Sequence, residues 1–171
     1  MLLNLLKRVD AALVRMESAL LVALLSFMVG MAFTQVAARQ LFHTGILWGD
    51  TLLRHLVLWV GFLGAALATV DEKHFAWDTV VGLLNGRAKA AMLFFAHTAA
   101  GVITFLLIKA SWVYLLDEKS GGKPLFSISE HPIPEWWFAV IIPVGFSLIL
   151  IHLAVKAAHE LAEVAGGRPT E

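Results

Sequence analysis

The chain has 171 residues, of which 59% are hydrophobic and only 15% charged, and its mean hydropathy is +0.78. Soluble globular domains carry about 25% charged residues, so this composition indicates a membrane protein. Thirteen Lys and Arg residues balance thirteen Asp and Glu residues, which argues against the basic patch that a nucleic-acid partner needs. The sequence contains no cysteine, and this excludes disulfides, thiolate metal sites and iron–sulfur clusters.

Four long apolar runs predict four transmembrane helices. The first run is uncharged over 20 residues, enough to cross a hydrocarbon core of roughly 30 Å at about 1.5 Å per residue. The predicted spans are residues 19–38, 48–70, 90–116 and 134–155, followed by a tail at 156–171. Pro143 lies inside the fourth span and is expected to kink it. Because no connection is long enough for a second domain, we expect residues 1–171 to form a single all-α membrane domain.

The residues before the first span are predicted to form an interfacial amphipathic helix at positions 1–17. Their apolar members recur at helical spacing, while the charged residues lie elsewhere. These apolar members are Leu2, Leu5, Leu6, Val9, Ala12, Leu13 and Met16. The first apolar run is longer than the 7–15 residues of a signal peptide, and 18 residues precede it. We therefore interpret it as an uncleaved anchor.

The distribution of Lys and Arg predicts the orientation. Eight of these residues fall on the side of the termini and of the connection between the second and third spans, and three fall on the other side. The eight are Lys7, Arg8, Arg15, Lys73, Arg87, Lys89, Lys156 and Arg168, and the three are Arg39, Lys119 and Lys123. The positive-inside rule then places both termini in the cytoplasm.

Three charged residues lie within the second and third runs. Asp50 and Arg54 are four residues apart with the acid first, the favourable order for a helical ion pair. Such a pair either stabilises a helix start or marks a contact with another protein or a water-filled path, since charged groups at a membrane edge seldom face lipid. Lys109, about seven residues from the end of its predicted helix, is expected to snorkel outward.

The histidines suggest an alternative hypothesis, that the chain is part of a redox protein. His55, His97 and His152 lie on three different spans, and His97 and His152 lie at depths compatible with a shared haem b. A haem-binding membrane anchor is therefore the alternative function, although interhelical hydrogen bonds explain the same histidines. Clustered carboxylates, nucleophile motifs and phosphate-binding loops are absent from the sequence. We expect neither an enzyme, nor a metal site, nor any cofactor on the favoured interpretation.

A stripe of small residues runs along the second span. Gly61, Gly64, Ala65 and Ala68 recur at the spacing i, i+3, i+4, i+7, which lets another helix approach closely. The partner helix lies either in this chain or in another protein.

Two stretches resemble a known family. The first comprises Val36-x-x-Arg39, Trp48-x-Asp50-x-x-x-Arg54, the segment 58–66 (LWVGFLGAA) and Lys73-His74-x-x-x-Asp78. The second is Pro134-x-Trp136, followed by Pro143-x-Gly145-Phe146. With four predicted spans, this pattern resembles the small membrane subunit of tripartite ATP-independent periplasmic (TRAP) transporters over essentially the whole chain. That family usually has Glu where this chain has Asp50, which is one methylene shorter.

The resemblance implies a function that composition could not show. Such a subunit joins a large membrane subunit, and the two receive an organic acid from a periplasmic substrate-binding protein and import it with a sodium gradient. The small subunit would widen the fixed scaffold in the bacterial inner membrane, surrounded by lipid, and would offer the binding protein a docking surface. The candidate contact or structural residues are Arg39, Trp48, Asp50, Arg54, Gly61, Gly64, Ala65, Ala68, His74 and Asp78.

Overall fold

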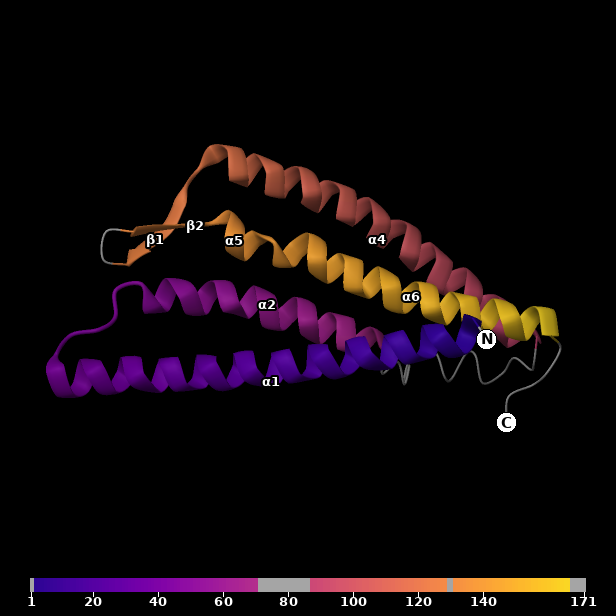
Figure 1. Ribbon diagram of the computed structural model, residues 1–171, viewed down its shortest axis with the longest axis horizontal. Helices are drawn as coiled ribbons and strands as arrows, with labels where there is room; N and C mark the ends of the chain where they lie inside the picture. Colours follow the sequence, from indigo (N-terminus) through magenta and orange to yellow (C-terminus); the bar gives the residue numbers. More distant parts are fainter. Residues whose placement is uncertain (1, 71–86, 129–130, 167–171) are drawn as a thin grey trace.

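The computed structural model describes residues 2–70, 87–128 and 131–166. Long helices dominate this part of the chain (Figure 1). They are α1 (Leu2–Phe42), α2 (Gly49–Val70), α4 (Arg87–Gly121) and α6 (Ile141–Gly166), with a single turn, α5 (Trp136–Ala139), before α6. Each long helix contains a segment long and apolar enough to cross a membrane. The predicted all-α membrane fold with four spans is confirmed.

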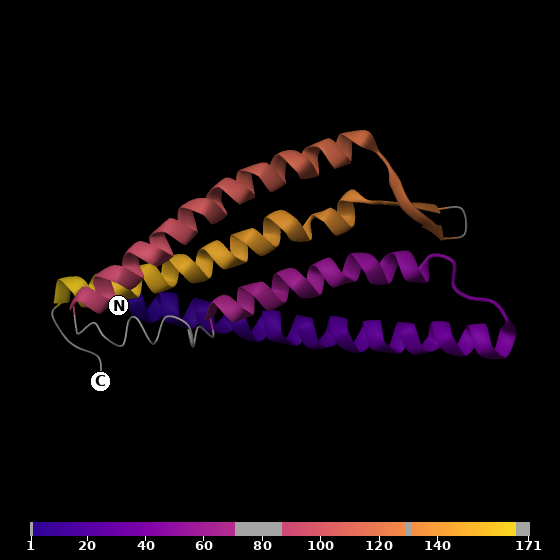
Figure 2. The same cartoon turned by 180° about the vertical axis from the view of Figure 1, so that it is seen from behind.

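The long helices lie side by side in the order α1, α2, α6, α4, so α1 and α4 form the two edges (Figures 1 and 2). Buried residues make up 33% of the apolar segment of α6 but only 6% of that of α1. The buried apolar side chains come mainly from the two inner helices, and they include Leu56, Leu63, Ala66, Ile141 and Leu153. Large apolar side chains cover the outward surfaces of α1 and α4, as expected for helices that face lipid or another membrane protein.

α1 is a single helix from Leu2 to Phe42, so residues 2–17 continue directly into the predicted first span. At about 1.5 Å per residue, its 41 residues extend for roughly 60 Å, twice the hydrocarbon thickness. The separate interfacial helix predicted for residues 1–17 is not confirmed. α6 likewise continues to Gly166, well beyond residue 155, so most of the predicted tail is helical.

The predicted kink at Pro143 takes the form of a break between α5 and α6. Proline has no N–H, so Pro143 cannot donate to the carbonyl oxygen of Ala139, four residues earlier. α5 ends at Ala139, and α6 starts at Ile141. Beside this break, the Trp59 indole N–H of α2 donates to the carbonyl oxygen of Phe138 over 3.2 Å.

A small β-hairpin was not predicted from the sequence. It consists of β1 (Pro124–Ile128) and β2 (His131–Pro134), paired antiparallel with an irregularity between Pro124 and Phe126. α4 leads into it through Gly122, whose positive φ of 60° suits glycine after a helix end. The hairpin and the loop 43–48 lie at one end of the bundle, which we call the hairpin end (Figure 1). The opposite end, where α1 begins and α6 finishes, is the terminal end.

Candidate functional site

A polar cluster at the hairpin end joins α1, the loop 43–48 and the start of α2. Gln35, only 3% exposed, accepts a hydrogen bond from the Ile46 N–H (2.9 Å) and donates to the Ile46 carbonyl oxygen (3.0 Å) and to Asp50 Oδ1 (3.3 Å). Arg39 donates to Asp50 Oδ2 over 2.5 Å. A Cβ at Gly49 would lie 2.2 Å from Gln35 Nε2, so the loop packs this closely only because Gly49 lacks a side chain. We call Gln35, Arg39 and Asp50 the hairpin-end cluster.

The predicted ion pair between the side chains of Asp50 and Arg54 is wrong. The Asp50 carboxylate pairs with Arg39 from the neighbouring helix instead. Arg54 Nε donates to the main-chain oxygen of Asp50 over 3.3 Å, and the Arg54 side chain is exposed. The four-residue spacing along α2 allows a pair between Asp50 and Arg54. The loop 43–48, however, reverses the direction of the chain and brings Arg39 of α1 closer to the Asp50 carboxylate. Arg54 therefore forms no ion pair with Asp50, and its side chain remains exposed.

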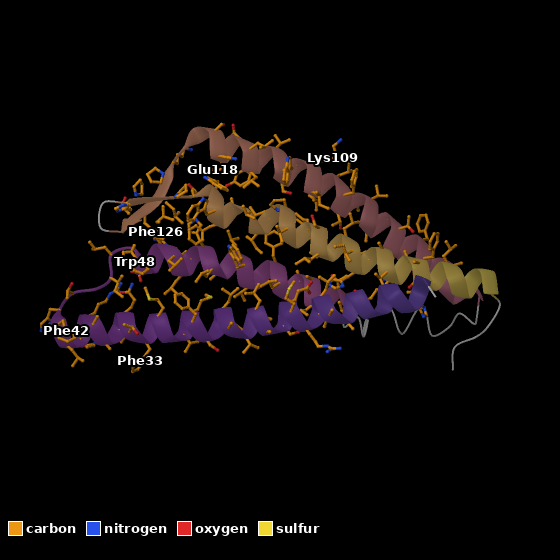
Figure 3. The ribbon with its side chains drawn as sticks, in the orientation of Figure 1. Phe33, Phe42, Trp48, Lys109, Glu118 and Phe126 are labelled. Atoms are coloured by element: carbon orange, nitrogen blue, oxygen red, sulfur yellow. The ribbon has the colours of Figure 1, made fainter. Side chains whose placement is uncertain are left out.

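Aromatic side chains attach the hairpin to the helices at the same end. The Trp48 ring stacks on Phe126 of β1 with 5.8 Å between centroids, and Phe126 lies 6.0 Å from Phe138 of α5. Lys119, near the end of α4, places its ammonium 5.3 Å from the centroid of the Trp136 ring. Figure 3 shows Trp48 and Phe126 next to each other, between the loop 43–48 and the hairpin. The predicted contact residue Trp48 thus has a structural partner within the chain.

A second polar cluster lies toward the terminal end and joins α1 to α6. The ring of His152, 1% exposed, has Nδ1 2.6 Å from Asp10 Oδ1 and Nε2 3.1 Å from Glu17 Oε1. One carboxyl group therefore lies at each ring nitrogen of His152, and both contacts join α1 to α6. We call Asp10, Glu17 and His152 the terminal-end cluster. Asp10 and Glu17 were not among the predicted site residues, although their spacing of seven places them on one face of a helix.

The paired histidines do not favour haem ligation. Both ring nitrogens of His152 lie next to carboxylates, and His97 Nδ1 lies 2.8 Å from Glu160 Oε1. His97 and His152 therefore have separate carboxylate partners and do not face a common ligand. Within the described ranges, no group of three or more His, Cys, Asp or Glu residues is arranged to hold a metal ion. The haem hypothesis gains no support.

The small-residue stripe on α2 faces away from the rest of the chain. Gly61, Ala65 and Ala68 are exposed, and a Cβ built on Gly61 or Gly64 would meet no atom within 4 Å. Gly145 of α6 is the opposite case, because its Cβ would lie 2.5 Å from the Phe62 ring. Close helix packing inside the chain therefore uses Gly145 and Phe62, and the stripe is available to another molecule.

An apolar groove of about 390 Å³ lies between α4 and α6. Its nine lining residues are His97, Thr98, Gly101, Val102, Phe105, Leu150, Leu153, Ala154 and Ala157. Apart from His97 and Thr98 these are apolar, and none is Lys or Arg. The lining does not suit an organic anion, which is recognised by cationic groups and hydrogen-bond donors.

Two predicted contact residues, His74 and Asp78, lie outside the described residues. Arg39, Trp48 and Asp50 come together at the hairpin end, whereas Arg54 and the small-residue stripe lie along the outward side of α2. Sequence reasoning missed Gln35, whose signal was the one amide side chain inside the uncharged run 19–38, four residues before Arg39.

Four long apolar helices, with their ion pairs gathered toward the two ends, define a multi-pass membrane protein. Residues 28–163 match the family of the DctQ component of tripartite ATP-independent periplasmic transporters. Because this match covers most of the chain, the protein belongs to that family, the small membrane subunits of TRAP transporters.

Individual relatives agree with this assignment. A Haemophilus influenzae Rd protein, provisionally named TRAP transporter small permease protein, is 29% identical over 77% of this chain and 81% of its own length. The C4-dicarboxylate TRAP transporter small permease protein DctQ of Pseudomonas aeruginosa is 27% identical over 63% of this chain and 51% of its own length. The sialic acid TRAP transporter permease protein SiaT of H. influenzae 86-028NP is 27% identical over 66% of this chain, but the match spans only 18% of that protein.

Proposed function

We propose that this chain is the small, non-catalytic membrane subunit of a sodium-coupled TRAP-type importer of organic acids. It acts as a scaffold for a large transport subunit in the bacterial inner membrane, with both termini in the cytoplasm. The observation that carries the scaffold role is the outward-facing stripe on α2, where Gly61 and Gly64 have nothing packed against them.

The existence of a large partner subunit is supported by SiaT, a relative that is much longer than this chain. The match to SiaT covers only 18% of that permease, so in SiaT the similar segment is joined to a much longer polypeptide. The remainder of SiaT would correspond to the proposed large subunit. Small residues on an outward helix face are what close packing between membrane helices requires, because association in lipid depends on van der Waals contact.

Organic acids are proposed as the substrate class from the family and its named members. Two relatives are named for C4-dicarboxylates and for sialic acid, and both are carboxylates. The sodium gradient comes from the family resemblance alone. The substrate and sodium sites would lie in the large subunit, which agrees with the apolar lining of the groove between α4 and α6.

The hairpin end is the proposed docking surface for the periplasmic substrate-binding protein. It carries exposed charges on Arg39, Asp50 and Arg54, and the hairpin projects beyond the ends of α2, α4 and α5, although α1 reaches farther (Figure 1). Aromatic contacts between Trp48, Phe126 and Phe138 fix the hairpin in position, and a preorganised surface loses less entropy on binding.

Substitution of Gly64 by Leu tests the scaffold role. A larger side chain on the stripe should separate α2 from a partner helix without disturbing the chain itself, since nothing in the chain lies within 4 Å of the Gly64 Cβ position. The matched control is Gly30→Leu on α1, where the Cβ position is equally open. Tagged subunit is purified in mild detergent, and the co-purified large subunit is quantified together with sodium-driven uptake in vesicles.

We expect Gly64→Leu to lower both the yield of large subunit and uptake, and Gly30→Leu to leave them near the wild-type level. Wild-type yield and uptake for Gly64→Leu would contradict packing of this stripe on the large subunit. If wild-type protein retains no large subunit, the scaffold function itself is wrong.

A further inference from the structure

The last apolar segment of the chain is interrupted between α5 and α6. α5 is a single turn, and Val140, which follows it, belongs to neither helix. The Val140 N–H donates to the Trp136 carbonyl oxygen, and the Val140 carbonyl oxygen accepts from the Val144 N–H, both over 3.2 Å. Pro143 has no N–H to continue the pattern. Because isolated helices shorter than about 12 residues are marginal, the direction of α5 depends on its neighbours.

α4 holds the start of α5. The Lys119 ammonium lies 5.3 Å from the centroid of the Trp136 ring, and the Glu135 N–H donates to the Lys123 carbonyl oxygen over 3.1 Å. These contacts keep the first residues of the turn next to the end of α4. The end of the turn, beside the break, contacts α2 instead.

α2 contacts the end of α5 through one of its faces. His55 and Trp59, four residues apart on that face, both approach Phe138. The Trp59 indole N–H donates to the Phe138 carbonyl oxygen over 3.2 Å, and the His55 ring centroid lies 5.9 Å from that of Phe138. His55 Nε2 also lies 3.9 Å from Glu135 Oε1. An indole nitrogen can only donate a hydrogen bond, so Trp59 of α2 supplies a partner to a main-chain acceptor of α5.

Phe138 connects this contact to the hairpin. Its ring centroid lies 6.0 Å from that of Phe126 in β1, and Phe126 stacks on Trp48, which immediately precedes α2. Figures 1 and 2 show the hairpin and α5 together between the end of α4 and the start of α2. Aromatic pairs allow several ring arrangements, whereas the hydrogen bond from Trp59 joins two defined atoms. The hydrogen bond is therefore the more exact constraint on where α5 lies.

Two stretches that carry the family resemblance meet at the break. Trp59 and Phe62 belong to the segment 58–66, and Pro143 and Gly145 belong to the pattern in the last helix. A Cβ at Gly145 would lie 2.5 Å from the Phe62 ring, so α2 and α6 are in close contact just beyond the break. α2 thus contacts both sides of the interruption, α5 through Trp59 and α6 through Phe62.

We propose that Trp59 is the positioning residue of the hairpin end. Its indole N–H holds the end of α5 against α2, and α5 holds the hairpin through the contact between Phe138 and Phe126. The small-residue stripe lies on the opposite side of α2 from Trp59. This inference deepens the proposed function and rests on it for the two partners. The docking surface for the substrate-binding protein is fixed relative to the helix that packs on the large subunit.

Replacement of Trp59 by benzothienylalanine tests the hydrogen bond alone. This amino acid has the shape of tryptophan but carries sulfur in place of the ring N–H, so the packing around it is retained. Trp59→Phe removes the same donor together with part of the ring. Trp137→Phe, on α5 itself, is the matched control because the Trp137 side chain is 53% exposed.

Spin-label distances report where the hairpin lies in the isolated subunit. The chain has no cysteine, so Val57→Cys on α2 and Ser127→Cys on β1, both at exposed positions, give a single labelled pair. Double electron–electron resonance should give one narrow distance distribution when Trp59 is present and a broadened or shifted distribution when its N–H is removed. The pair Val57→Cys and Val113→Cys, on α2 and α4, should give the same distribution in every variant.

Three results would overturn the inference. An unchanged distribution for the pair at positions 57 and 127 in both Trp59 variants would show that this contact does not position the hairpin. A change in Trp59→Phe but not with benzothienylalanine would assign the position to ring packing rather than to the N–H. An equal change in Trp137→Phe would show that α5 responds to any loss of an indole.

Binding of the periplasmic partner separates this inference from the proposed function. The probe is a purified substrate-binding protein that supports uptake by the wild-type complex. Benzothienylalanine at position 59 should weaken its binding to the complex about two- to tenfold, the effect of one lost hydrogen bond, and should retain the large subunit. Unchanged affinity despite a displaced hairpin would overturn the link between hairpin position and docking. If the wild-type complex binds no such protein while the distances still respond to Trp59, the docking function is wrong and the positioning role of Trp59 stands.

Discussion

His152 shows how one buried side chain holds two helices together. Its ring lies between Asp10 and Glu17, which both come from α1, while His152 itself belongs to α6. Glu17 is 1% exposed, so its charge is screened little by solvent and depends on the histidine. This arrangement gives the early part of α1 a packing partner and explains why residues 2–17 need not lie flat on a membrane surface.

Substitution of His152 by Ala should destabilise the isolated subunit strongly. Removal of one partner from a buried charge cluster leaves uncompensated charge and typically costs about 3–5 kcal/mol. Thermal unfolding in detergent, followed by the fluorescence of the six tryptophans, measures the change. Addition of Glu17→Gln to His152→Ala should recover part of the loss, since it removes the buried charge. Equal unfolding temperatures for His152→Ala and wild type would show that the cluster contributes nothing.

Arg54 should matter for assembly or transport but not for the stability of the chain. Among the residues that the structure describes, it donates only to a main-chain oxygen one turn away, and exposed polar contacts of this kind contribute at most about 1 kcal/mol. We expect Arg54→Ala to leave the unfolding temperature of the isolated subunit unchanged and to lower complex yield or uptake severely.

The Asp50 side chain provides the comparison for Arg54. Asp50→Glu, which restores the usual family residue, should be tolerated because the longer carboxylate still reaches Arg39. Arg39 and Asp50 are about half exposed, so Arg39→Ala should cost less than about 1 kcal/mol of folding free energy. Wild-type uptake for both Arg54→Ala and Asp50→Ala would restrict these residues to a local structural role.

At the scale of elements, one face of α2 packs against α6, and the face with the small-residue stripe has nothing packed against it. Leu56, Leu63 and Ala66 are buried on the inner face, and Phe62 packs edge-to-face on Phe146 of α6 with 5.1 Å between ring centroids. Gly145 allows this approach, because any Cβ there would overlap Phe62. The sequence alone does not distinguish Gly61 and Gly64 from Gly145. The role of each glycine depends on which neighbour its helix face contacts in the fold.

Gly145→Ala should therefore destabilise the isolated subunit. The added methyl forces Phe62 or α6 to shift, and overpacking of this kind costs about 1–3 kcal/mol. For a protein of this size, such a loss lowers the unfolding temperature by several degrees, at about 2–4 °C per kcal/mol. Gly64→Ala is the matched control and should unfold like wild type. A Gly145→Ala variant as stable as wild type would mean that the contact with Phe62 relaxes freely.

The sequence predicted the helices of this molecule better than the contacts between them. Long apolar runs identify spans because their length is imposed by the membrane. The partner of Asp50 was wrong because Arg54 is near in sequence while Arg39 is near in space. His152 and Asp10 are separated by 142 residues, and no local pattern indicates such a pair. The hairpin was missed because its second strand, His131–Pro134, contains two prolines, which normally argue against a strand.

At the scale of the whole molecule, the helix arrangement makes a specific prediction about orientation. The loop 43–48 and the hairpin lie at one end, and the start of α1 and the end of α6 lie at the other (Figure 1). Eight Lys and Arg residues belong to the side of the termini and three to the other side. The positive-inside rule then predicts that the hairpin end faces the periplasm, where a substrate-binding protein could reach it.

Single-cysteine labelling tests this orientation, because the natural chain has no cysteine to replace. Thr44→Cys and Ser127→Cys are exposed at the hairpin end, and Leu161→Cys is exposed near the terminal end of α6. In intact cells, a membrane-impermeant maleimide should label the first two variants, while Leu161→Cys should react only after the inner membrane is permeabilised. The reverse pattern would invert the topology and remove the hairpin end as a docking surface for a periplasmic partner. Labelling of only one of the two hairpin-end positions would instead contradict the shared side that the loop 43–48 and the hairpin have in this fold.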